Sequence, residues 1–339
     1  MTQRKKSKTA NSQPEILVAE GLCKTYGHRK ALQELSFSLR AGHILGFLGP
    51  NGAGKTTAIR ILTTMLEPDS GHFAVDGIGS EYPEKIRRRI GVLPENLGFP
   101  RQMTGIEYLT YFGQLYGRTA AKARESGHTL LENVGLQQRE KSLIGSFSHG
   151  MRQRIGIARA LVNDPVVVFL DEPTLGLDPR GQQELLEMIQ RIARERNTGV
   201  VLCSHLLSEI EGVCDDVVIL NLGQIVAKGT VAEVIGRVQH TTIPRNAVRI
   251  QVAPALAAQA RKILKEIPKV KKITPISEME GWLRVELVAP VIGKSSEFYQ
   301  VTNNILGALI KVKIPILGFE VDGGRLQDVF LHLTEETIK

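Results

Sequence analysis

Short apolar runs alternate with longer stretches of helical periodicity from residue 15 to about residue 237. The apolar runs lie at 43–48, 166–170, 200–204 and 217–220. Such runs are typical of strands that are buried on both faces, as in a parallel sheet. Their alternation with helical patterns predicts an α/β layer architecture for this part of the chain.

The pattern changes at residues 238–246, where threonine, proline and asparagine occur without periodicity and predict a linker. Residues 247–339 then form a second, smaller region. Its predicted elements are a strand at 248–252, a helix at 256–267, strands at 270–276 and 283–287, a helix at 298–309, a strand at 312–321 and a closing helix at 326–334. Because β-α-β-β-α-β is the split-βαβ order, we predict an α+β, ferredoxin-like accessory domain.

Composition and charge narrow the class of protein. The chain has 339 residues, which is room for two domains. Its 43 basic and 35 acidic residues give a net charge of +8. Residues 1–14 hold four of the basic side chains and no acidic one, so we expect a basic, disordered tail, with contact to anionic lipid or nucleic acid as the alternative. The remaining 39 basic and 35 acidic residues are too nearly balanced to indicate a nucleic-acid partner.

Cysteine usage and the length of the apolar segments bear on the location of the protein. The cysteines, Cys23, Cys203 and Cys214, lack metal-ligand spacing. An odd number of cysteines without a disulfide framework is typical of a protein in a reducing cytosol. No apolar stretch reaches 18 residues, so we expect that the chain cannot cross a bilayer by itself. Any membrane role then requires another polypeptide.

A glycine-rich segment after the first buried run carries the clearest chemistry. Residues 49–56 match G-x-x-x-x-G-K-[ST] between a predicted strand and a predicted helix. Backbone N–H groups of such a loop and the helix N-terminus cradle phosphates. Lys55 is expected to reach the β- and γ-phosphates, and the Thr56 hydroxyl to bind Mg²⁺. The predicted nucleotide-binding residues are Gly49, Pro50, Asn51, Gly52, Ala53, Gly54, Lys55, Thr56 and Thr57.

An acidic pair closes the second buried run, at Asp171 and Glu172. Because parallel strands share one carboxyl edge, we expect this pair to lie beside the phosphate-binding loop. Asp171 is predicted to hold Mg²⁺, and Glu172 to polarise the attacking water as a general base. A guanine-reading Asn-Lys-x-Asp segment is absent from the sequence, which argues against a GTPase.

Further motifs resemble those of the ATP-binding cassette (ABC) ATPases. The segment FSHGMRQR at 147–154 resembles the family signature, LGLD at 175–178 the D-loop, and Ser204-His205 the switch histidine. Tyr26 in KTYG resembles the aromatic residue that stacks on adenine. The resemblance covers residues 15–237 and implies a P-loop cassette with a helical insertion at about 97–150.

The resemblance also implies residue roles. Tyr26 would contact adenine. Ser148 and Gly150 would begin a helix that faces the γ-phosphate of ATP bound by a second copy of the chain. His205 would hydrogen-bond the γ-phosphate and orient Glu172, and Asp178 would lie at the dimer interface.

Three positions depart from the family pattern. His149 and Met151 replace a glycine and the glutamine of the signature, but both keep the backbone N–H groups that the phosphate contact uses. The Q-loop glutamine falls on Glu95, which carries a charge and only accepts hydrogen bonds. We hypothesise that Glu95 binds Mg²⁺, since carboxylates are good Mg²⁺ ligands; the alternative is an ordinary surface glutamate.

The resemblance therefore predicts the ATP-hydrolysing subunit of an ABC transporter, with ATP and Mg²⁺ bound. The resemblance is strongest to bacterial export cassettes, including those for drugs, polysaccharides and gliding motility. The expected partners are a separate transmembrane permease and a second copy of the chain, at the cytoplasmic face of the cell membrane. The alternatives are an importer ATPase with a regulatory domain, a soluble ABC protein acting on ribosomes or DNA, and a nucleotide sensor that does not hydrolyse.

Overall fold

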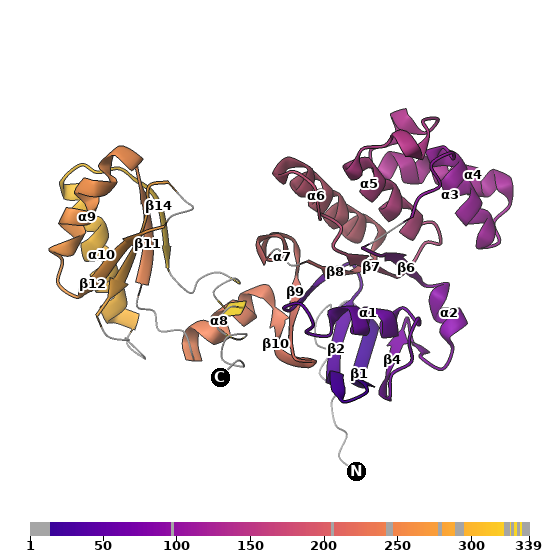
Figure 1. Cartoon of the computed structure of the whole chain (residues 1–339), viewed down its shortest axis with the longest axis horizontal. Coiled ribbons are helices and arrows are strands. Elements are labelled where there is room, and N and C mark those ends of the chain that lie inside the picture. The colour runs from indigo at the N-terminus through magenta and orange to yellow at the C-terminus, as the bar shows by residue number, and fades with distance from the viewer. Residues whose placement is uncertain are drawn as a thin grey trace, which may run out of the picture. The chain divides into compact units, whose positions relative to one another are not determined.

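The chain divides into two compact units, residues 1–231 and 232–339, which are described separately (Figure 1). The computed structural model describes residues 14–95, 98–204, 207–241, 247–276, 280–288 and 295–321, together with Leu326, Val329, Phe330 and Leu333.

A six-stranded sheet runs through the first unit, in the order β10-β9-β3-β8-β7-β6. All its neighbours are parallel except β10, which pairs antiparallel with β9. The strands are β3 (Ile44–Leu48), β6 (Ile90–Leu93), β7 (Val167–Asp171), β8 (Gly199–Cys203), β9 (Asp216–Asn221) and β10 (Gln224–Thr230). Four of them coincide with the apolar runs, and β3 and β8 are buried along their whole length.

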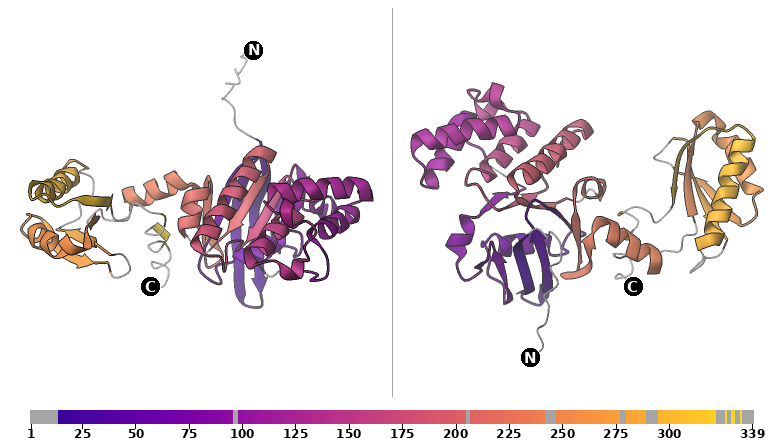
Figure 2. Two further views of the ribbon diagram at one scale, coloured as in Figure 1. Left: turned by 90° about the horizontal axis from the view of Figure 1, so that it is seen from above. Right: turned by 180° about the vertical axis from the view of Figure 1, so that it is seen from behind.

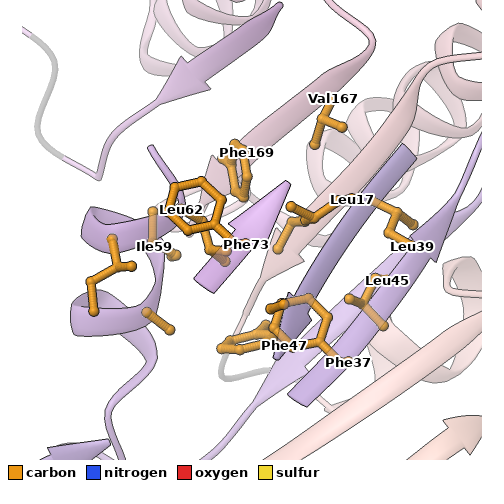
Figure 3. Close-up of a cluster of buried hydrophobic side chains, with 14 of the residues drawn as sticks. Leu17, Phe37, Leu39, Leu45, Phe47, Ile59, Leu62, Phe73, Val167 and Phe169 are labelled. Carbon is orange, nitrogen blue, oxygen red and sulfur yellow. The ribbon is translucent and has the colours of Figure 1, made fainter. Parts of the chain in front are cut away.

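A second sheet of four antiparallel strands, in the order β2-β1-β4-β5, packs against the first. Its strands are β1 (Glu15–Tyr26), β2 (Arg29–Arg40), β4 (Ser70–Val75) and β5 (Ile78–Gly79). Phe37 and Phe73 of this sheet and Phe47 and Phe169 of the parallel sheet meet in one buried cluster (Figure 3). The Phe37 and Phe47 rings are 5.4 Å apart between centroids. This core fixes the two sheets relative to each other and so fixes the loops at their edges.

Helices cover both faces of the parallel sheet (Figure 2). Helix α1 (Lys55–Leu62) packs into the core between the sheets through Ile59 and Leu62, while α5 (His149–Ala160) and α6 (Pro179–Arg196) lie on the opposite face. Between β6 and β7 the described residues form α3 (Gly105–Leu115), α4 (Ala120–Asn133), two short 3₁₀ turns and α5. A capping box starts α3, since Thr104 and Glu107 each accept the other's backbone N–H. The first unit also holds α2 (Pro83–Arg87) and α7 (Leu207–Val213).

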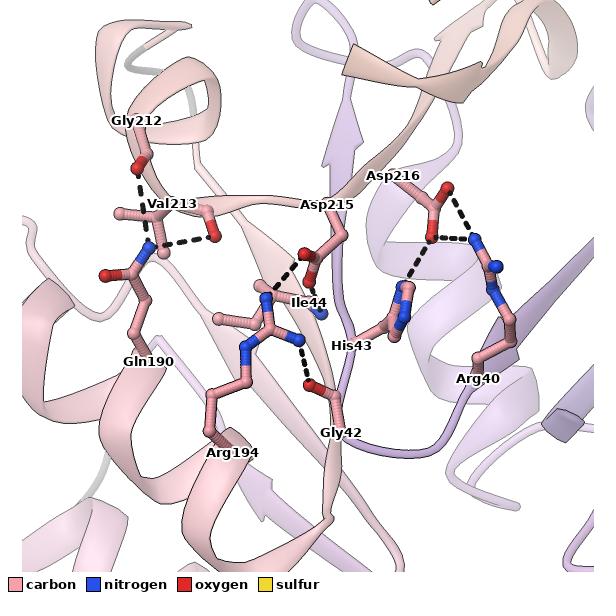
Figure 4. A network of polar contacts seen from close by, with 10 residues as sticks. All are labelled: Arg40, Gly42, His43, Ile44, Gln190, Arg194, Gly212, Val213, Asp215 and Asp216. Carbon is pink, nitrogen blue, oxygen red and sulfur yellow. Dashed lines mark hydrogen bonds and ion pairs between the residues drawn. The ribbon is translucent and has the colours of Figure 1, made fainter. Parts of the chain in front are cut away.

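Polar contacts fasten the amino ends of β3 and β9 to α6 (Figure 4). Asp215 accepts the Ile44 backbone N–H at 2.8 Å and pairs with Arg194. Asp216 accepts from His43 at 3.1 Å and from Arg40 at 3.2 Å. These groups lie at the opposite end of the parallel strands from the glycine-rich loop, so they stabilise the scaffold rather than the predicted site.

The second unit contains a four-stranded antiparallel sheet in the order β12-β13-β11-β14. Its elements are α8 (Val231–Thr241), β11 (Ala247–Val252), α9 (Ala257–Lys265), β12 (Val270–Pro275), β13 (Trp282–Leu287), α10 (Ser295–Lys311) and β14 (Ile316–Val321). Alternate residues of β11, namely Val248, Ile250 and Val252, are buried against α9 and α10 with Leu264 and Ile305. From β11 to β14, the element order is the one that the sequence pattern predicts. The predicted closing helix at 326–334 lies mostly outside the described residues.

The predicted bounds of the linker differ from those in the structure. The predicted linker at 238–246 begins inside α8, which extends to Thr241. Residues 242–246 and residues 1–13 of the predicted tail lie outside the described residues. In the parts of the chain that the structure describes, no helix is long and apolar enough to cross a membrane.

Candidate functional site

A cleft with a volume of about 660 Å³ opens at the carboxyl ends of β3 and β7. It is lined by Tyr26, Arg29, Ala31, Asn51, Gly52, Ala53, Gly54, Lys55, Thr56, Thr57, Glu95, Asp171, Glu172 and Leu175. The fold thus brings together the predicted aromatic residue, most of the glycine-rich loop and the acidic pair from three distant parts of the chain. Gly49 and Pro50 complete the loop without lining the cleft, and His205 lies outside the described residues.

The glycines of the loop are required by its backbone. Gly52 has φ +82° and Gly54 has φ +110°, which L-residues with a side chain rarely adopt. A Cβ at Gly54 would stand 2.5 Å from the Ala31 carbonyl oxygen. Gly54 precedes the first residue of α1, so its conformation directs the N-terminus of that helix toward the cleft. Unpaired N–H groups and the positive end of the dipole at this point favour a phosphate.

Two basic side chains lie along the loop. The Lys55 ammonium donates to the carbonyl oxygens of Gly49 at 2.5 Å and Pro50 at 3.2 Å. The Arg29 guanidinium donates to the Gly52 carbonyl oxygen at 2.9 Å. Arg29 was not among the predicted residues, although it follows Tyr26 by only three positions. An arginine at the exposed start of a strand carries no motif, and only the close approach of β2 to the loop reveals its place.

The acidic pair occupies the end of β7. Burial raises the pKa of Asp171, and the neighbouring charges of Glu172 and Glu95 raise it further, whereas Lys55 and Arg60 act in the opposite sense. Glu172 has φ +50°, a left-handed conformation that is uncommon for a residue with a side chain, and its N–H donates to the Cys203 carbonyl at 2.9 Å. Backbone strain of this kind is concentrated at functional sites.

These donors fit a divalent cation bound with a triphosphate. The Thr56 hydroxyl and the Asp171 carboxylate line the same cleft, and Mg²⁺ in such sites takes one or two protein ligands besides phosphate oxygens and water. The raised pKa of Asp171 marks a place where added positive charge is favourable. Among the described residues, no three His, Cys, Asp or Glu side chains are grouped to hold a metal ion, so Glu95 is not gathered with the acidic pair around one point.

The signature segment does not contribute to its own chain's cleft. Ser148 caps α5, accepting the Met151 N–H at 3.2 Å, and neither Ser148 nor Gly150 lines the cleft. The exposed N-terminus of α5 is therefore available to another molecule. His149 extends from this end of α5 to the loop that follows Glu172.

A buried carboxylate behind the cleft was missed in the sequence. Glu209 on α7 is 7% exposed, and its Oε2 accepts the hydroxyls of Ser204 at 2.7 Å and Thr174 at 2.9 Å. It joins the loop after β7 to the end of β8, immediately before the predicted switch histidine. Its Oε1 is buried and has no hydrogen-bond partner among the described residues. The only available signal was an acidic residue four positions after His205.

A second cavity, with a volume of about 610 Å³, lies between the segment after β6 and the start of α5. It is lined by Glu95, Gly98, Phe99, Arg101, Ile144, Gly145, His149, Arg152 and Gln153. Glu95 lines both this cavity and the nucleotide cleft. A displacement of Glu95 in one cavity would therefore also alter the lining of the other.

Comparisons with known proteins agree with this geometry. A sequence profile of the ABC transporter family matches residues 32–175. The linearmycin resistance ATP-binding protein LnrL of Bacillus subtilis (strain 168) is 32% identical over 327 residues, covering 96% of this chain and all of that protein. The bacitracin transport ATP-binding protein BcrA of Bacillus licheniformis is 42% identical over 211 residues, covering 62% of this chain and 68% of that protein.

A solved structure supports the same assignment. The structure of an ATP-binding subunit of an ABC transporter superimposes with a TM-score of 0.58 at 31% identity, covering 66% of this chain and 92% of that one. The match covers an α/β P-loop cassette fold. With the phosphate-binding loop and the acidic strand end in one cleft, the chain therefore belongs to the ABC transporter family, as one of its ATP-hydrolysing cassettes.

Proposed function

We propose that this chain is the ATP-hydrolysing subunit of a membrane exporter. The observation that carries the proposal is that Lys55, Asp171 and Glu172 line one cleft. The export direction is supported by the relatives, which include ATP-binding proteins for linearmycin resistance, bacitracin transport and daunorubicin/doxorubicin resistance.

In the proposed reaction the chain positions ATP and a water molecule. Tyr26 stacks on adenine, and the loop from Gly49 to Thr57 binds the phosphates, with Lys55 at the β- and γ-phosphates. When bound through Thr56 and Asp171, Mg²⁺ supplies positive charge against the phosphate oxygens. Glu172 accepts the proton of the water that attacks the γ-phosphate, and His205 orients Glu172. Such catalysis depends chiefly on positioning and charge neutralisation.

The active form is proposed to be a dimer of two copies. Ser148 and Gly150 present the N-terminus of α5 to the γ-phosphate held by the other copy, and Asp178 lies at the interface. The support is that neither Ser148 nor Gly150 lines the chain's own cleft, although the N-terminus of α5 is suited to bind an anion. Closure around two MgATP then drives the transport subunit.

The transport subunit is proposed to be a separate transmembrane permease, which places this chain at the cytoplasmic face of the membrane. The second cavity is the proposed docking place, because it combines the apolar Phe99 and Ile144 with Arg101 and Arg152 and shares Glu95 with the nucleotide cleft. A permease helix bound there would change its position with the nucleotide state of the cleft.

Residues 15–237 are proposed to form the cassette, with a helical insertion at about 97–150, and residues 247–339 a ferredoxin-like accessory domain. The antiparallel strand order β12-β13-β11-β14 supports the latter. The accessory domain is proposed to regulate the cassette or to stabilise its dimer.

Glu95 is proposed to contact Mg²⁺ once nucleotide is bound. Its charge acts on Asp171, and it lines the same cleft. We expect Glu95→Gln to raise the Mg²⁺ concentration needed for half-maximal ATPase rate by about threefold to tenfold, because one carboxylate is lost from the cation's surroundings. Titrating Mg²⁺ at fixed ATP measures this. An unchanged midpoint would show that Glu95 does not act on the cation.

Isolation of the native complex tests the function as a whole. The tagged full chain, purified from detergent-solubilised membranes of its own host, should hydrolyse MgATP and carry a polytopic membrane protein identified by mass spectrometry. A complex that exports a labelled drug from vesicles supports the proposal. A complex that contains a substrate-binding protein and imports, or a chain found only with ribosomes or DNA, contradicts it.

A further inference from the structure

His149 makes a contact that a glycine at its position would not make. It is the first residue of α5, and its Nε2 lies 2.8 Å from the carbonyl oxygen of Leu175. Because a carbonyl oxygen only accepts, this contact requires the proton on Nε2. The imidazole thus joins the signature segment to the loop that follows the acidic pair.

Leu175 is in turn bonded to Glu172. The Leu175 N–H donates to the Glu172 carbonyl oxygen at 3.2 Å, and the Glu172 N–H donates to the Cys203 carbonyl oxygen at 2.9 Å. Glu172 is therefore held in its left-handed conformation from both sides. Leu175 also lines the nucleotide cleft, which places this turn beside the acidic pair.

Two neighbouring residues fix the backbone on either side of this contact. Ser148 caps α5 and fixes the backbone from which His149 projects. Gly176 has φ +77°, a left-handed conformation that favours glycine, so the turn beside the ring depends on this residue.

We propose that His149 is a positioning residue that holds the Leu175 turn, and through it the backbone of Glu172, in the conformation required for hydrolysis. This rests on the proposed function, because Glu172 must act as the general base. The His149 side chain does not line the chain's own nucleotide cleft, so its removal slows the chemical step and leaves nucleotide binding unchanged.

The test compares four full-length chains in steady-state ATPase assays: native, His149→Ala, His149→Phe and His149→Gln. Alanine and phenylalanine remove the donor, and phenylalanine keeps the ring's bulk. We expect both to lower kcat about tenfold, which corresponds to about 1.4 kcal/mol and lies within the range of a single hydrogen bond. KM for ATP should stay within about twofold of native. Glutamine places an N–H near the position of Nε2 and should restore kcat to within about threefold.

A double variant shows whether His149 acts through Glu172. In single-turnover assays, adding His149→Ala to Glu172→Gln should not slow the residual rate further, because the residue being positioned has already lost its role. His128→Phe is the matched control, since His128 is another partly exposed histidine with a 2.8 Å polar contact, to Glu140. It should hydrolyse at the native rate.

The outcomes separate this proposal from the function on which it rests. Native kcat in His149→Ala, a glutamine variant as slow as the alanine variant, a rise in KM alone, or an additive double variant each overturns the role of His149. Failure of the native chain to hydrolyse ATP instead overturns the proposed function. Thermal melting curves confirm that all variants are folded, and if the alanine chain does not fold, the phenylalanine and glutamine chains decide.

Discussion

Replacing Glu172 with glutamine should nearly abolish ATP hydrolysis while leaving ATP bound. The side chain keeps its size but no longer accepts a proton from water, and general bases of this kind contribute about 10²–10⁴-fold to a rate. We therefore expect kcat to fall by at least about 10²-fold. The left-handed backbone at this position is kept, because the substitution changes only the end of the side chain.

Two measurements separate binding from chemistry in this variant. Phosphate release reports the rate, and fluorescent-nucleotide titration should give a Kd within about threefold of native. Because hydrolysis is stopped, the dimer should accumulate in the presence of MgATP. Light scattering after size-exclusion chromatography detects it. Glu187→Gln on an exposed face of α6 makes the same chemical change away from the cleft and should behave as native. A Glu172→Gln chain that keeps a tenth of the native kcat would show that another group takes the proton.

The parallel sheet was predictable because its information is local. Each central strand is a short apolar run; β3 is followed by a glycine, and β7 ends at an acidic residue. The first run was predicted from residue 43, and β3 begins at Ile44; the His43 side chain bonds Asp216 at 3.1 Å. The order of motifs then placed the loop and the acidic pair at one edge of the sheet, as the fold has them.

The antiparallel sheet was not predicted, because its register is irregular. β1 shifts register between Ala19 and Leu22 and again near Lys24, so its buried residues do not alternate cleanly. Its partners are also distant, since β4 begins at Ser70. A pattern of period two, which identifies a half-buried strand, is lost when bulges interrupt it.

Element ends were also misplaced where a backbone conformation decided them. The last predicted strand was taken from residue 312, but β14 begins at Ile316, after Lys313 in a left-handed conformation and Pro315, which has no N–H to donate. Met65 and Leu66 continue the apolar spacing of Ile59 and Leu62 beyond the glycine-rich loop, but α1 ends at Leu62 and Met65 is 75% exposed. The left-handed Thr64 accounts for that end.

The site shows the same division between local and distant information. The phosphate-binding loop is one continuous segment, so its spacing identified it. Arg29 reaches Gly52 across 23 positions, and Glu209 reaches Thr174 across 35, and no spacing rule connects such pairs. Both were found only when the fold brought them to the cleft or behind it.

Removing the ammonium group of Lys55 should weaken nucleotide binding as well as hydrolysis. Lys55 is the basic residue at the start of α1, and its contacts with the Gly49 and Pro50 carbonyls hold it along the loop that it would share with the phosphates. We expect Lys55→Ala to raise Kd for MgATP about 10–100-fold and to lower kcat by at least about 10³-fold, since lysine and Mg²⁺ neutralise charge that develops on the γ-phosphate.

Thermal shift and phosphate release together test the lysine. Native protein should gain melting temperature with increasing MgATP, because a ligand that binds only the folded state stabilises it, and the alanine variant should gain little at the same concentrations. Lys55→Arg keeps the charge but not the compact point donor, so it should recover some binding and little hydrolysis. Lys85→Ala removes an ammonium that lies 4.2 Å from the Tyr82 ring, away from the cleft, and should retain the native response. An unaltered MgATP shift in Lys55→Ala would mean that the loop binds the triphosphate through its backbone and helix N-terminus alone.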